Sequence, residues 1–415
     1  MQTRDLSLEQ LQNVVGGEHA REATRQDAVD GVVPSFVARP GSVEEISELM
    51  RVASGAGAAV VPRGAGTKMH LGNPPHRAEV IVDMTRMDRV LEHAAADQVL
   101  RVQAGVKLDE LQEELAASNQ MLAIDPPERG ATIGGVVAAN ASGPLRLRYG
   151  TIRDLIIGIR VVLSDGTVAK AGGKVVKNVA GYDLSKLFTG SLGTLGVIAE
   201  ANFRLHPIPE VARTVTVAVE DAGGAAGAAR AVASSQIVPS AVELLWDGDR
   251  REISVLLESI PGGIGAKVET ARFLLRPFGE VREEEGRVLP EMEPAEVELK
   301  VNAPPAELSG VIESVTGAAE RRGLEVSLRG HAASGVTFAA VSGGGEEDIS
   351  DLIAELREIR SRRGGSVVLA RAPVGLKRRT EVWGYAGDAF ELMRRVKEKF
   401  DPPGTMSPGR FVGGI

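Results

Sequence analysis

The sequence predicts an α+β fold in at least two domains, and three observations support this prediction. The chain has 415 residues, whereas a usual domain has roughly 100–200. Its N-terminal half alternates short apolar runs with glycine-rich loops. Its C-terminal half alternates strands and helices in an order that suits an antiparallel sheet with helices on one face. Pro207 and Pro209 lie between the halves and indicate a domain boundary.

In the N-terminal half, apolar runs bounded by glycine, proline or polar residues predict the strands. We expect strands at 33–38, 58–61, 80–82, 90–93, 99–102, 155–163 and 197–205. Ser42 to Glu45 have the pattern of a capping box, and apolar residues at helical spacing predict a helix that ends at Gly55. A second helix is expected from residue 108, and Asp165-Gly166 is a hairpin turn signal.

The C-terminal half repeats one order of elements. We expect strands at 215–219, 241–245, 253–257, 297–301, 324–328, 336–341 and 367–370. Helices are expected at 225–234, 266–275, 308–321 and 349–362, and a last helix at 389–400. This order predicts an antiparallel sheet that carries its helices on one face.

Composition excludes several kinds of function. The formal net charge is −8, whereas a protein that binds nucleic acid usually carries a basic balance. The chain has no Cys, which excludes disulfides, thiolate catalysis, Fe–S ligation and Cys-based zinc sites within it. Glycine occurs 49 times, well above the usual share of ~7%. Without a collagen repeat, this excess is expected in turns and in loops that approach a ligand.

Targeting signals are not found in the sequence. No stretch approaches the ~18 consecutive apolar residues of a membrane span, and residues 1–18 lack a basic start followed by an apolar run. We therefore expect a cytoplasmic location, and a peripheral position at the inner membrane through a partner stays open.

Familiar nucleotide-binding and metal-binding motifs are absent from the sequence or only partly matched. Gly55 to Val60 matches half of the dinucleotide fingerprint, but it follows a helix and precedes a strand. A Rossmann nicotinamide site is therefore not expected. No P-loop and no H-E-x-x-H occurs, and the six His residues are scattered, so we expect neither an ATPase nor a metal site.

Three glycine-rich segments are the positive signals. In the first, Arg63 to Lys68, small residues would let N–H groups converge on an anion between two cations, and a plain turn is the alternative. In the second, Ala131 to Gly143, a helix that starts near Ile133 would aim free N–H groups at a phosphate, and tight helix packing is the alternative. The third comprises residues 178–184 and 190–198, and a glycine-rich loop shaped only for packing is the alternative.

Together these segments resemble the FAD-binding domain of the vanillyl-alcohol oxidase / p-cresol methylhydroxylase (PCMH) superfamily, over residues 35–207 and the C-terminal tail. More narrowly, Gly172 to Leu184 and Asp401 to Phe411 are similar to the accessory FAD-binding subunits of glycolate oxidase, which accompany a catalytic FAD subunit. The resemblance implies a PCMH-type FAD-binding domain of two α/β subdomains, followed by a ferredoxin-like antiparallel α+β cap domain. The implied domains are 1–31 (N-terminal segment), 32–207 (FAD-binding), 208–385 (cap) and 386–415 (C-terminal helix and tail returning to the flavin).

The resemblance implies FAD as the cofactor. The first loop would hold the pyrophosphate mainly through its backbone, the second segment would follow pyrophosphate and flavin, and Ile198 would contact adenine. Thr67 stands where flavinylated relatives carry the attaching His, and His70 has the wrong offset, so non-covalent FAD is implied. The implied cofactor-binding residues are Pro62, Arg63, Gly64, Ala65, Gly66, Thr67, Lys68, Met69, Pro126, Thr132, Ile133, Gly134, Gly135, Ala138, Asn140, Ser142, Gly143 and Ile198.

Two residues are candidates for the chemistry. The family's C-terminal N-P-G-[KR] reads Ser407-Pro408-Gly409-Arg410 here, which makes Arg410 the candidate cation near the flavin N1–C2=O edge. A plain surface arginine is the alternative. The H-x-G-D-G-N-x-H-like segment of related 2-hydroxy-acid dehydrogenases is reduced to His331, and an isolated His at a strand junction is more often structural than catalytic.

The resemblance therefore implies an FAD-dependent oxidoreductase, the FAD-binding subunit of a glycolate oxidase type complex that oxidises a small 2-hydroxy acid. A catalytic FAD subunit and an Fe–S subunit are the implied partners. Two alternatives stay open. One is a self-sufficient D-lactate or 2-hydroxy-acid dehydrogenase, in which Arg329 or Arg371 would bind the substrate carboxylate. The other is a non-catalytic, flavin-bearing scaffold.

Overall fold

The computed structural model describes residues 6–173, 183–291 and 295–415. Their internal contacts divide the chain into two units. Unit 1 comprises Met1–Ser142, Thr151–Ile208 and Tyr385–Ile415, and unit 2 comprises Gly143–Gly150 and Pro209–Gly384. Residues 174–182, which carry part of the likeness to the accessory glycolate oxidase subunits, lie outside the described residues. The four domain ranges that the resemblance implies stay a prediction.

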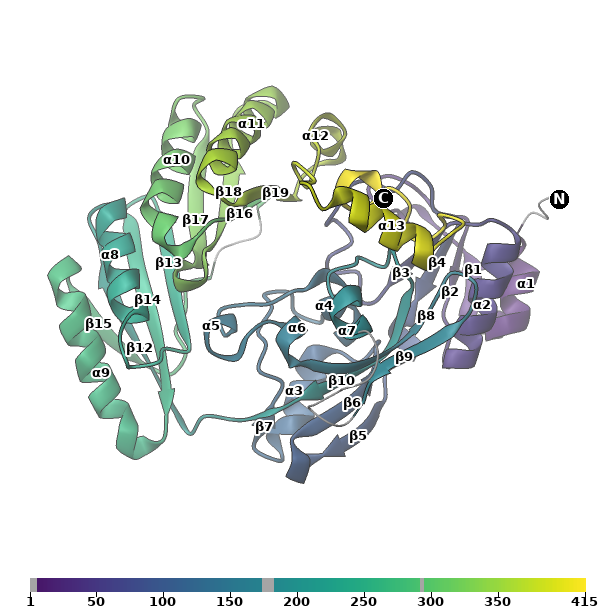
Figure 1. Cartoon of the computed structure of the whole chain (residues 1–415), viewed down its shortest axis with the longest axis horizontal. Helices are drawn as coiled ribbons and strands as arrows, with labels where there is room; N and C mark the ends of the chain where they lie inside the picture. The colour runs from purple at the N-terminus through teal and green to yellow at the C-terminus, as the bar shows by residue number, and fades with distance from the viewer. Residues whose placement is uncertain (1–5, 174–182, 292–294) are drawn as a thin grey trace. The chain divides into compact units, whose positions relative to one another are not determined.

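A mixed sheet forms the first half of unit 1, with the strand order β1-β2-β4-β3 (Figure 1). Its strands are β1 (Ala20–Glu22), β2 (Phe36–Ala38), β4 (Val80–Asp83) and β3 (Val60–Arg63). β1 pairs antiparallel with β2, whereas β2, β4 and β3 run parallel. Parallel neighbours need a crossover connection, and α2 (Val43–Gly55) lies between β2 and β3 in the chain. The carboxyl ends of β3 and β4 therefore lie at the same edge of this sheet.

Helix α2 begins where the sequence predicts. The Ser42 hydroxyl accepts a hydrogen bond from the Glu45 N–H at 3.1 Å, which satisfies one of the free donors of the first turn. The reciprocal bond of a capping box is not formed, because Glu45 Oε2 accepts from the Gly41 N–H at 2.7 Å instead. α1 (Leu8–Val15) packs beside α2.

An antiparallel sheet forms the second half of unit 1, with the order β5-β6-β10-β8-β9. Its strands are β5 (Val90–Ala94), β6 (Val99–Gln103), β10 (Val197–Arg204), β8 (Ile156–Val162) and β9 (Val168–Gly172). The predicted hairpin is confirmed, since β8 pairs with β9 and Gly166 adopts φ +83° in the turn. Shorter elements of this unit are α3 (Leu108–Ala116), β7 (Gln120–Met121), α4 (Ile133–Ala139), α6 (Ile152–Leu155), α7 (Leu184–Phe188), β11 (His206–Pro207) and α13 (Phe390–Phe400).

Unit 2 repeats a βαββαβ motif within its described residues, as in a ferredoxin-like fold. The first copy comprises β12 (Val211–Ala218), α8 (Ala222–Ala233), β13 (Ala241–Asp247), β14 (Arg250–Ser259), α9 (Pro261–Leu275) and β15 (Val281–Glu285). The second comprises β16 (Val297–Asn302), α10 (Leu308–Glu320), β17 (Glu325–His331), β18 (Val336–Ser342), α11 (Glu346–Arg363) and β19 (Ser366–Arg371). β13 pairs with β17, so one antiparallel sheet runs through both copies in the order β15-β12-β14-β13-β17-β18-β16-β19.

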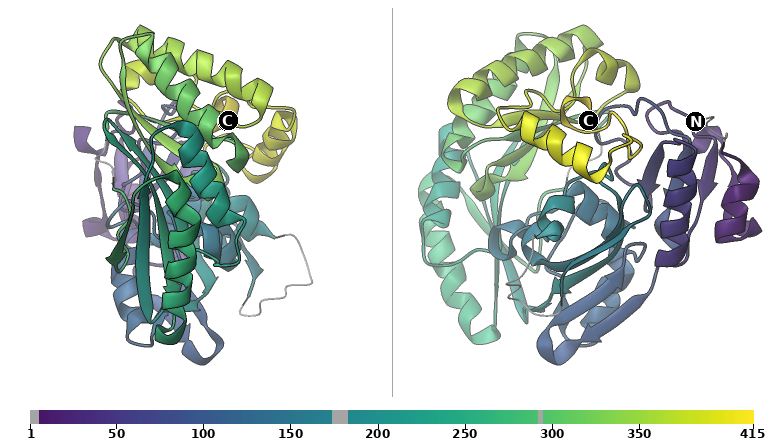
Figure 2. Two further views of the ribbon diagram at one scale, coloured as in Figure 1. Left: turned by 90° about the vertical axis from the view of Figure 1, so that its left-hand side faces the viewer. Right: turned by 45° about the vertical axis from the view of Figure 1, so that its right-hand side comes forward.

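Helices α8, α9, α10 and α11 of unit 2 lie on one face of this sheet (Figures 1 and 2). Buried residues from α8 to α11 form a core with Val255, Leu244 and Leu328. Because side chains alternate along a strand, Glu243, Arg329 and His331 point to the opposite face. We call this surface the polar sheet face. α5 (Arg146–Tyr149), from the separate segment of unit 2, packs against β13.

The predicted α+β class and antiparallel second half are confirmed. The charged strand β15 and the short helix α12 (Val374–Arg379) have no apolar period and were not expected. α9 begins at Pro261, five residues before the expected start, because Pro is favoured in the first helical turn.

Candidate functional site

Unit 1 contains a cavity with an empty volume of ≈ 870 Å³, its mouth included. All three glycine-rich segments contribute to its wall. They are the loop after β3, the segment around α4 and the turn that leads into β10. Arg410 of the C-terminal tail also lines the cavity. The segments that the sequence singled out therefore meet in one place, although residues 63 and 198 are far apart in the chain.

The first loop follows the carboxyl end of β3, and its backbone N–H groups are available as donors. Within the described ranges, no hydrogen bond takes the N–H groups of residues 64–67; the next donor is Met69, which bonds the Gly66 carbonyl. Gly66 adopts φ +80°, a conformation that glycine tolerates best. A row of free N–H groups in such a turn can bind an anion.

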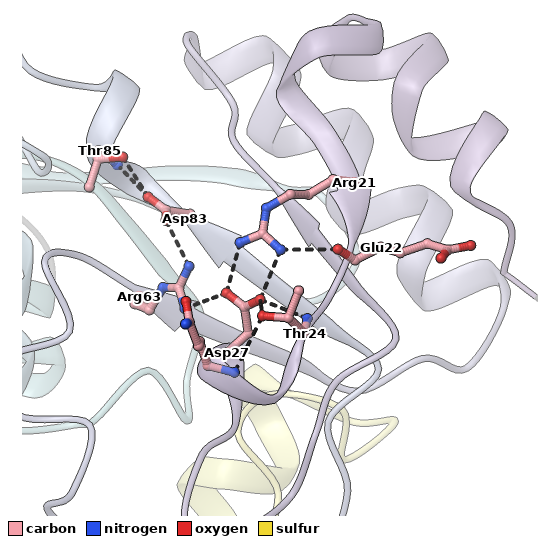
Figure 3. Close-up of polar contacts among 8 residues, drawn as sticks. Arg21, Glu22, Thr24, Asp27, Arg63, Asp83 and Thr85 are labelled. Carbon is pink, nitrogen blue, oxygen red and sulfur yellow. Dashed lines mark hydrogen bonds and ion pairs between the residues drawn. The ribbon is translucent and has the colours of Figure 1, made fainter.

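The Arg63 side chain is held away from this role by two carboxylates (Figure 3). Its Nη1 donates to Asp27 Oδ1 at 3.1 Å, and its Nη2 donates to Asp83 Oδ2 at 2.9 Å. Lys68 pairs with Glu128 at 2.9 Å, and both line the cavity. Both cations that the sequence placed beside the loop are therefore already paired with carboxylates.

Helix α4 begins at Ile133, as the sequence predicts, with Thr132 as its N-cap. However, the Ile133 N–H donates to the Val106 carbonyl at 2.9 Å and the Gly134 N–H to the Ala104 carbonyl at 2.7 Å. The Gly135 N–H donates to Thr132 Oγ1 at 3.4 Å. The prediction of free N–H groups at this helix start is therefore wrong, because the neighbouring backbone and the cap take them.

The glycines of these segments have two different tasks. A Cβ at Gly64 would lie 1.9 Å from Thr132 Oγ1, and one at Gly134 would lie 2.8 Å from Ala104 Cβ, so these two allow close packing. A Cβ at Gly135 would meet only Thr132 Oγ1, at 3.2 Å, and Gly135 is exposed at the cavity wall. Gly135 is thus the position at which a side chain would enter the cavity.

The C-terminal tail adds to the free edge of β3. The Val60 N–H donates to the Thr405 carbonyl and the Ser407 N–H to the Val60 carbonyl, both at 2.8 Å. This pairing brings Arg410 to the cavity, where its Nη2 donates to the carbonyls of Met69 and Leu71. Burial lowers the pKa of Arg410 to about 10, so the side chain stays cationic at neutral pH. It is only 2% exposed, which excludes the plain surface arginine.

Most of the predicted site residues line the cavity. These are Pro62 to Met69, Thr132, Gly134, Gly135, Ala138, Ile198 and Arg410. Five others do not line it, namely Pro126, Ile133, Asn140, Ser142 and Gly143. Ile133 is fully buried and packs, and Gly143 belongs to unit 2. Lining residues that the sequence did not indicate include Met84, Ala104 and Glu128. Met84 and Ala104 follow directly after β4 and β6, a position that could have indicated them.

The second candidate catalytic residue, His331, lies in unit 2 at the end of β17. It is 4% exposed, and its Nδ1 lies 3.0 Å from both carboxyl oxygens of Glu243 on β13. Burial lowers the pKa of His331 to about 3, and Arg146, Arg329 and Lys300 act in the same direction. Burial also raises the pKa of Glu243. Both directions favour a neutral pair at the polar sheet face.

Comparison with protein families gives two matches. A model described as "FAD binding domain" matches residues 34–172, and one described as "FAD linked oxidases, C-terminal domain" matches residues 248–411. Together they cover well over half of the chain. The chain belongs to the FAD-linked oxidases. Its cofactor is accordingly FAD.

Curated relatives of this FAD-linked oxidase include several proteins that span nearly its whole length. The glycolate oxidase subunit GlcD of Bacillus subtilis is 26% identical over 91% of this chain and 89% of its own. A D-lactate dehydrogenase of Archaeoglobus fulgidus is 27% identical over 91% of each chain. A mitochondrial D-lactate dehydrogenase (cytochrome) of Arabidopsis thaliana is 36% identical over 54% of this chain and 39% of its own.

Solved structures confirm the PCMH-type fold. p-Cresol methylhydroxylase with bound substrate aligns with a TM-score of 0.76 at 14% identity, over 97% of this chain and 95% of its own. 4-Ethylphenol oxidase of Gulosibacter chungangensis aligns with a TM-score of 0.74 at 16% identity, over 97% and 96%. At such identities the likeness concerns the fold alone.

The cavity of this FAD-linked oxidase fits the cofactor. The donors at residues 64–67 suit a pyrophosphate, and the side-chain-free wall at Gly135 permits close approach.

In the described part of the chain, no group of three His, Asp or Glu could hold a metal ion, and no helix is long and apolar enough to span a membrane.

Proposed function

We propose that this FAD-linked oxidase is an FAD-binding subunit of a glycolate oxidase type complex, which acts on a small 2-hydroxy acid together with a catalytic FAD subunit and an Fe–S subunit. The observation that carries the proposal is the cavity of unit 1, where three glycine-rich segments and buried Arg410 converge. The relatives named glycolate oxidase subunit and D-lactate dehydrogenase support a 2-hydroxy acid as the substrate.

The residues of the cavity have separate roles in this proposal. When bound, FAD would accept a hydride, which carries two electrons, from a substrate. The N–H groups of residues 64–67 hold its pyrophosphate, and Gly135 gives it room. Arg410 places a permanent cation in the cavity, where it stabilises negative charge on the isoalloxazine ring. Thr67 offers no attachment atom of the kind that flavinylated relatives use, so FAD is held without a covalent bond.

His331 supports the need for a partner subunit. A general base works best when its pKa lies near the operating pH, whereas burial holds the pKa of His331 near 3. Its Nδ1 is also engaged by Glu243. His331 is therefore a poor acceptor for the hydroxyl proton of a 2-hydroxy acid, and this favours substrate oxidation in the partner. The location that we propose is the cytoplasm, or the inner membrane surface through these partners.

One observation favours a second candidate, a self-sufficient D-lactate or 2-hydroxy-acid dehydrogenase. Arg329 and Lys300 lie on the polar sheet face together with His331, and after burial and Arg146 their charges also act to lower its pKa. Cations of this kind would bind a substrate carboxylate. In this case the Nε2 of His331, the ring nitrogen that Glu243 does not hold, would face the substrate hydroxyl.

Steady-state turnover with a dye acceptor separates the candidates. The purified chain should oxidise glycolate and D-lactate poorly, and activity should appear when a catalytic FAD subunit and an Fe–S subunit are added. Robust turnover of the chain alone that collapses in His331→Ala would overturn the subunit proposal in favour of the dehydrogenase. A reconstituted complex that is equally active when this chain is reconstituted without FAD would point to the scaffold.

The same preparation tests the mode of FAD binding. The purified chain should be yellow, and heat or acid should release free FAD into the supernatant. Flavin that stays on the denatured polypeptide would contradict non-covalent binding. A colourless protein that does not take up added FAD would contradict the proposed site itself.

A further inference from the structure

Four charged residues from three segments of unit 1 form one connected group beside the first glycine loop (Figure 3). Asp27 accepts two bonds from Arg21, at 2.8 and 2.9 Å, and one from Arg63 at 3.1 Å. On its other side, Arg63 donates to Asp83 at 2.9 Å. We call Arg21, Asp27, Arg63 and Asp83 the Arg63 clamp. Arg63 is the last residue of β3, directly before the loop whose N–H groups face the cavity.

Each carboxylate of the clamp is fixed by further donors. Asp27 also accepts from the Thr24 N–H at 2.9 Å and the Thr24 hydroxyl at 3.1 Å. Asp83 accepts from the Thr85 N–H at 3.0 Å and its hydroxyl at 2.6 Å. Asp27 is 5% and Asp83 9% exposed. The hydrogen bonds to Asp27, chiefly from Arg21, lower the pKa of Asp27, so this carboxylate stays ionised at neutral pH.

The clamp carries no net charge, because its two arginines and two aspartates cancel. Because its charge is balanced by the carboxylates, the Arg63 guanidinium adds little attraction for a phosphate. Its planar group is hydrogen-bonded on both sides, to Asp27 and to Asp83, and this fixes the backbone of Arg63. We propose that Arg63 is a positioning residue that, clamped between Asp27 and Asp83, sets the geometry of residues 64–67 so that their N–H groups converge on the FAD pyrophosphate. This inference rests on the proposed function of the cavity.

Positioning and direct charge recognition predict opposite outcomes for Asp27→Asn. This change leaves one positive charge in excess beside the loop and removes one of the two anionic partners of Arg63. If Arg63 attracted the phosphates by its charge, FAD would bind more tightly. If Arg63 positions the loop, FAD should bind at least ~10-fold more weakly, since charge-assisted hydrogen bonds are the strong ones. Arg63→Lys keeps the charge and loses the fork, so positioning predicts a comparable loss and charge recognition predicts no change.

The experiment titrates FAD, ADP and riboflavin into flavin-free protein. ADP contains a pyrophosphate and riboflavin does not, so the positioning role should weaken FAD and ADP binding in both variants and leave riboflavin binding unchanged. A general loss of structure would weaken all three ligands alike. Glu252→Gln in unit 2 is the matched control, because Glu252 accepts two bonds from Arg282 at 2.9 and 3.0 Å and one from Arg250. It should change FAD affinity less than twofold.

The outcomes are distinct. Tighter or unchanged FAD binding in Asp27→Asn or in Arg63→Lys would overturn the positioning role. So would equal losses for riboflavin and FAD. If Asp27→Asn does not fold, Arg63→Lys decides between the two roles, since only the positioning role predicts a loss there. A wild-type protein that binds neither FAD nor ADP would overturn the proposed function of the cavity rather than the role of Arg63.

Discussion

The cavity of unit 1 and the polar sheet face of unit 2 use different chemical groups. Nearly half of the residues that line the cavity are glycine or alanine, and two of its cations, Arg63 and Lys68, are paired with carboxylates. The polar sheet face presents side chains, with Glu243 and His331 buried as a pair among arginines and a lysine. Backbone donors keep their charge state at any pH, whereas a buried titratable pair does not.

The two regions therefore suit different tasks, the cavity the binding of a cofactor and the polar sheet face the transfer of a proton. A cofactor that stays bound through a reaction is well served by groups that do not titrate, and residues 64–67 provide such groups. A substrate proton needs a group that can accept it. The only candidate for that role which the sequence indicated, His331, has its pKa lowered by burial. Four changes test whether the two regions differ in this way.

The largest expected effect is the loss of FAD from Gly135→Asp. A carboxylate at this open position would lie beside a phosphate, and like charges ~4 Å apart repel by about 4 kcal/mol at an effective dielectric constant of ~20. This corresponds to roughly a thousandfold loss of affinity, measured by flavin content and by FAD titration. Gly135→Ala, which adds only a Cβ near Thr132 Oγ1, is the control and should retain most binding.

The neighbouring Gly134 should respond differently. Its Cβ would be 2.8 Å from Ala104 Cβ and 3.1 Å from the Ala104 carbonyl oxygen, so Gly134→Asp should fail to fold rather than fold without flavin. A folded Gly135→Asp protein with a full complement of FAD would show that the segment around α4 serves only packing, as the alternative interpretation of the sequence holds.

The second effect concerns the tail that carries Arg410. Lys397 of α13 is buried, and its Nζ donates to Asp401 Oδ2 and to the carbonyls of Thr194 and Met406, at 2.7 to 2.8 Å. Lys397→Met removes all three bonds and leaves a buried carboxylate with less compensation. Breaking a buried ion pair typically costs about 3–5 kcal/mol. We expect a lower melting temperature and FAD affinity reduced by roughly 10–100-fold.

Lys399→Met is the control for this change, since Lys399 is exposed on the same helix. It should leave both the melting temperature and the FAD affinity as in the wild type. If Lys397→Met lowers stability but leaves FAD affinity unchanged, Arg410 contributes nothing to the cavity, and the cation must be removed from the proposed mechanism.

The cavity could be predicted from the sequence more fully than the polar sheet face. Glycine has unusual backbone freedom and clusters visibly, so the three segments of the cavity and the start of α4 could be predicted from neighbouring residues. Which N–H groups remain free could not, because the donors of Ile133 and Gly134 are taken by Val106 and Ala104, whose approach depends on the tertiary fold. The same holds for Arg63 and its pairing with Asp27.

The polar sheet face was harder to predict. His331 pairs with Glu243, which lies 88 positions away in the sequence, and only the pairing of β13 with β17 brings the two together. No local pattern marks Glu243 as the partner. The alternation of apolar residues did predict most strands of this sheet, but it could not show that edge strands of two βαββαβ copies would join.

The third prediction is the pH dependence of the stability of unit 2. The pKa of His331 falls from 6.5 to about 3 on folding, so its contribution to stability is complete above pH 6.5 and is lost as the pH falls toward 3. The pKa of Glu243 rises above 4.5, so its contribution is complete below pH 4.5 and is lost as the pH rises. The two contributions oppose each other between pH 4.5 and 6.5, which predicts a broad optimum there.

Urea unfolding at several pH values measures this dependence, with a limiting slope of about 1.4 kcal/mol per pH unit for one group. The double variant Glu243→Gln/His331→Gln should lose stability overall, and its curve should be flatter both above pH 6.5 and below pH 4.5. A wild-type curve that keeps falling from pH 6.5 to pH 4.5 would instead indicate that Glu243 stays ionised beside a neutral His331.

The smallest expected effect tests whether charge matters in the cavity at all. Lys68 and Glu128 pair at 2.9 Å, with side chains 30% and 17% exposed, and such partly exposed pairs contribute about 0–1 kcal/mol. The double variant Lys68→Met/Glu128→Gln removes both charges and should change FAD affinity less than ~3-fold. Lys68→Met alone should weaken binding more, because it leaves the Glu128 carboxylate without its cation beside the phosphates. If the double variant also loses tenfold or more, Lys68 binds a phosphate directly, and the cavity recognises its ligand by charge as well as by backbone.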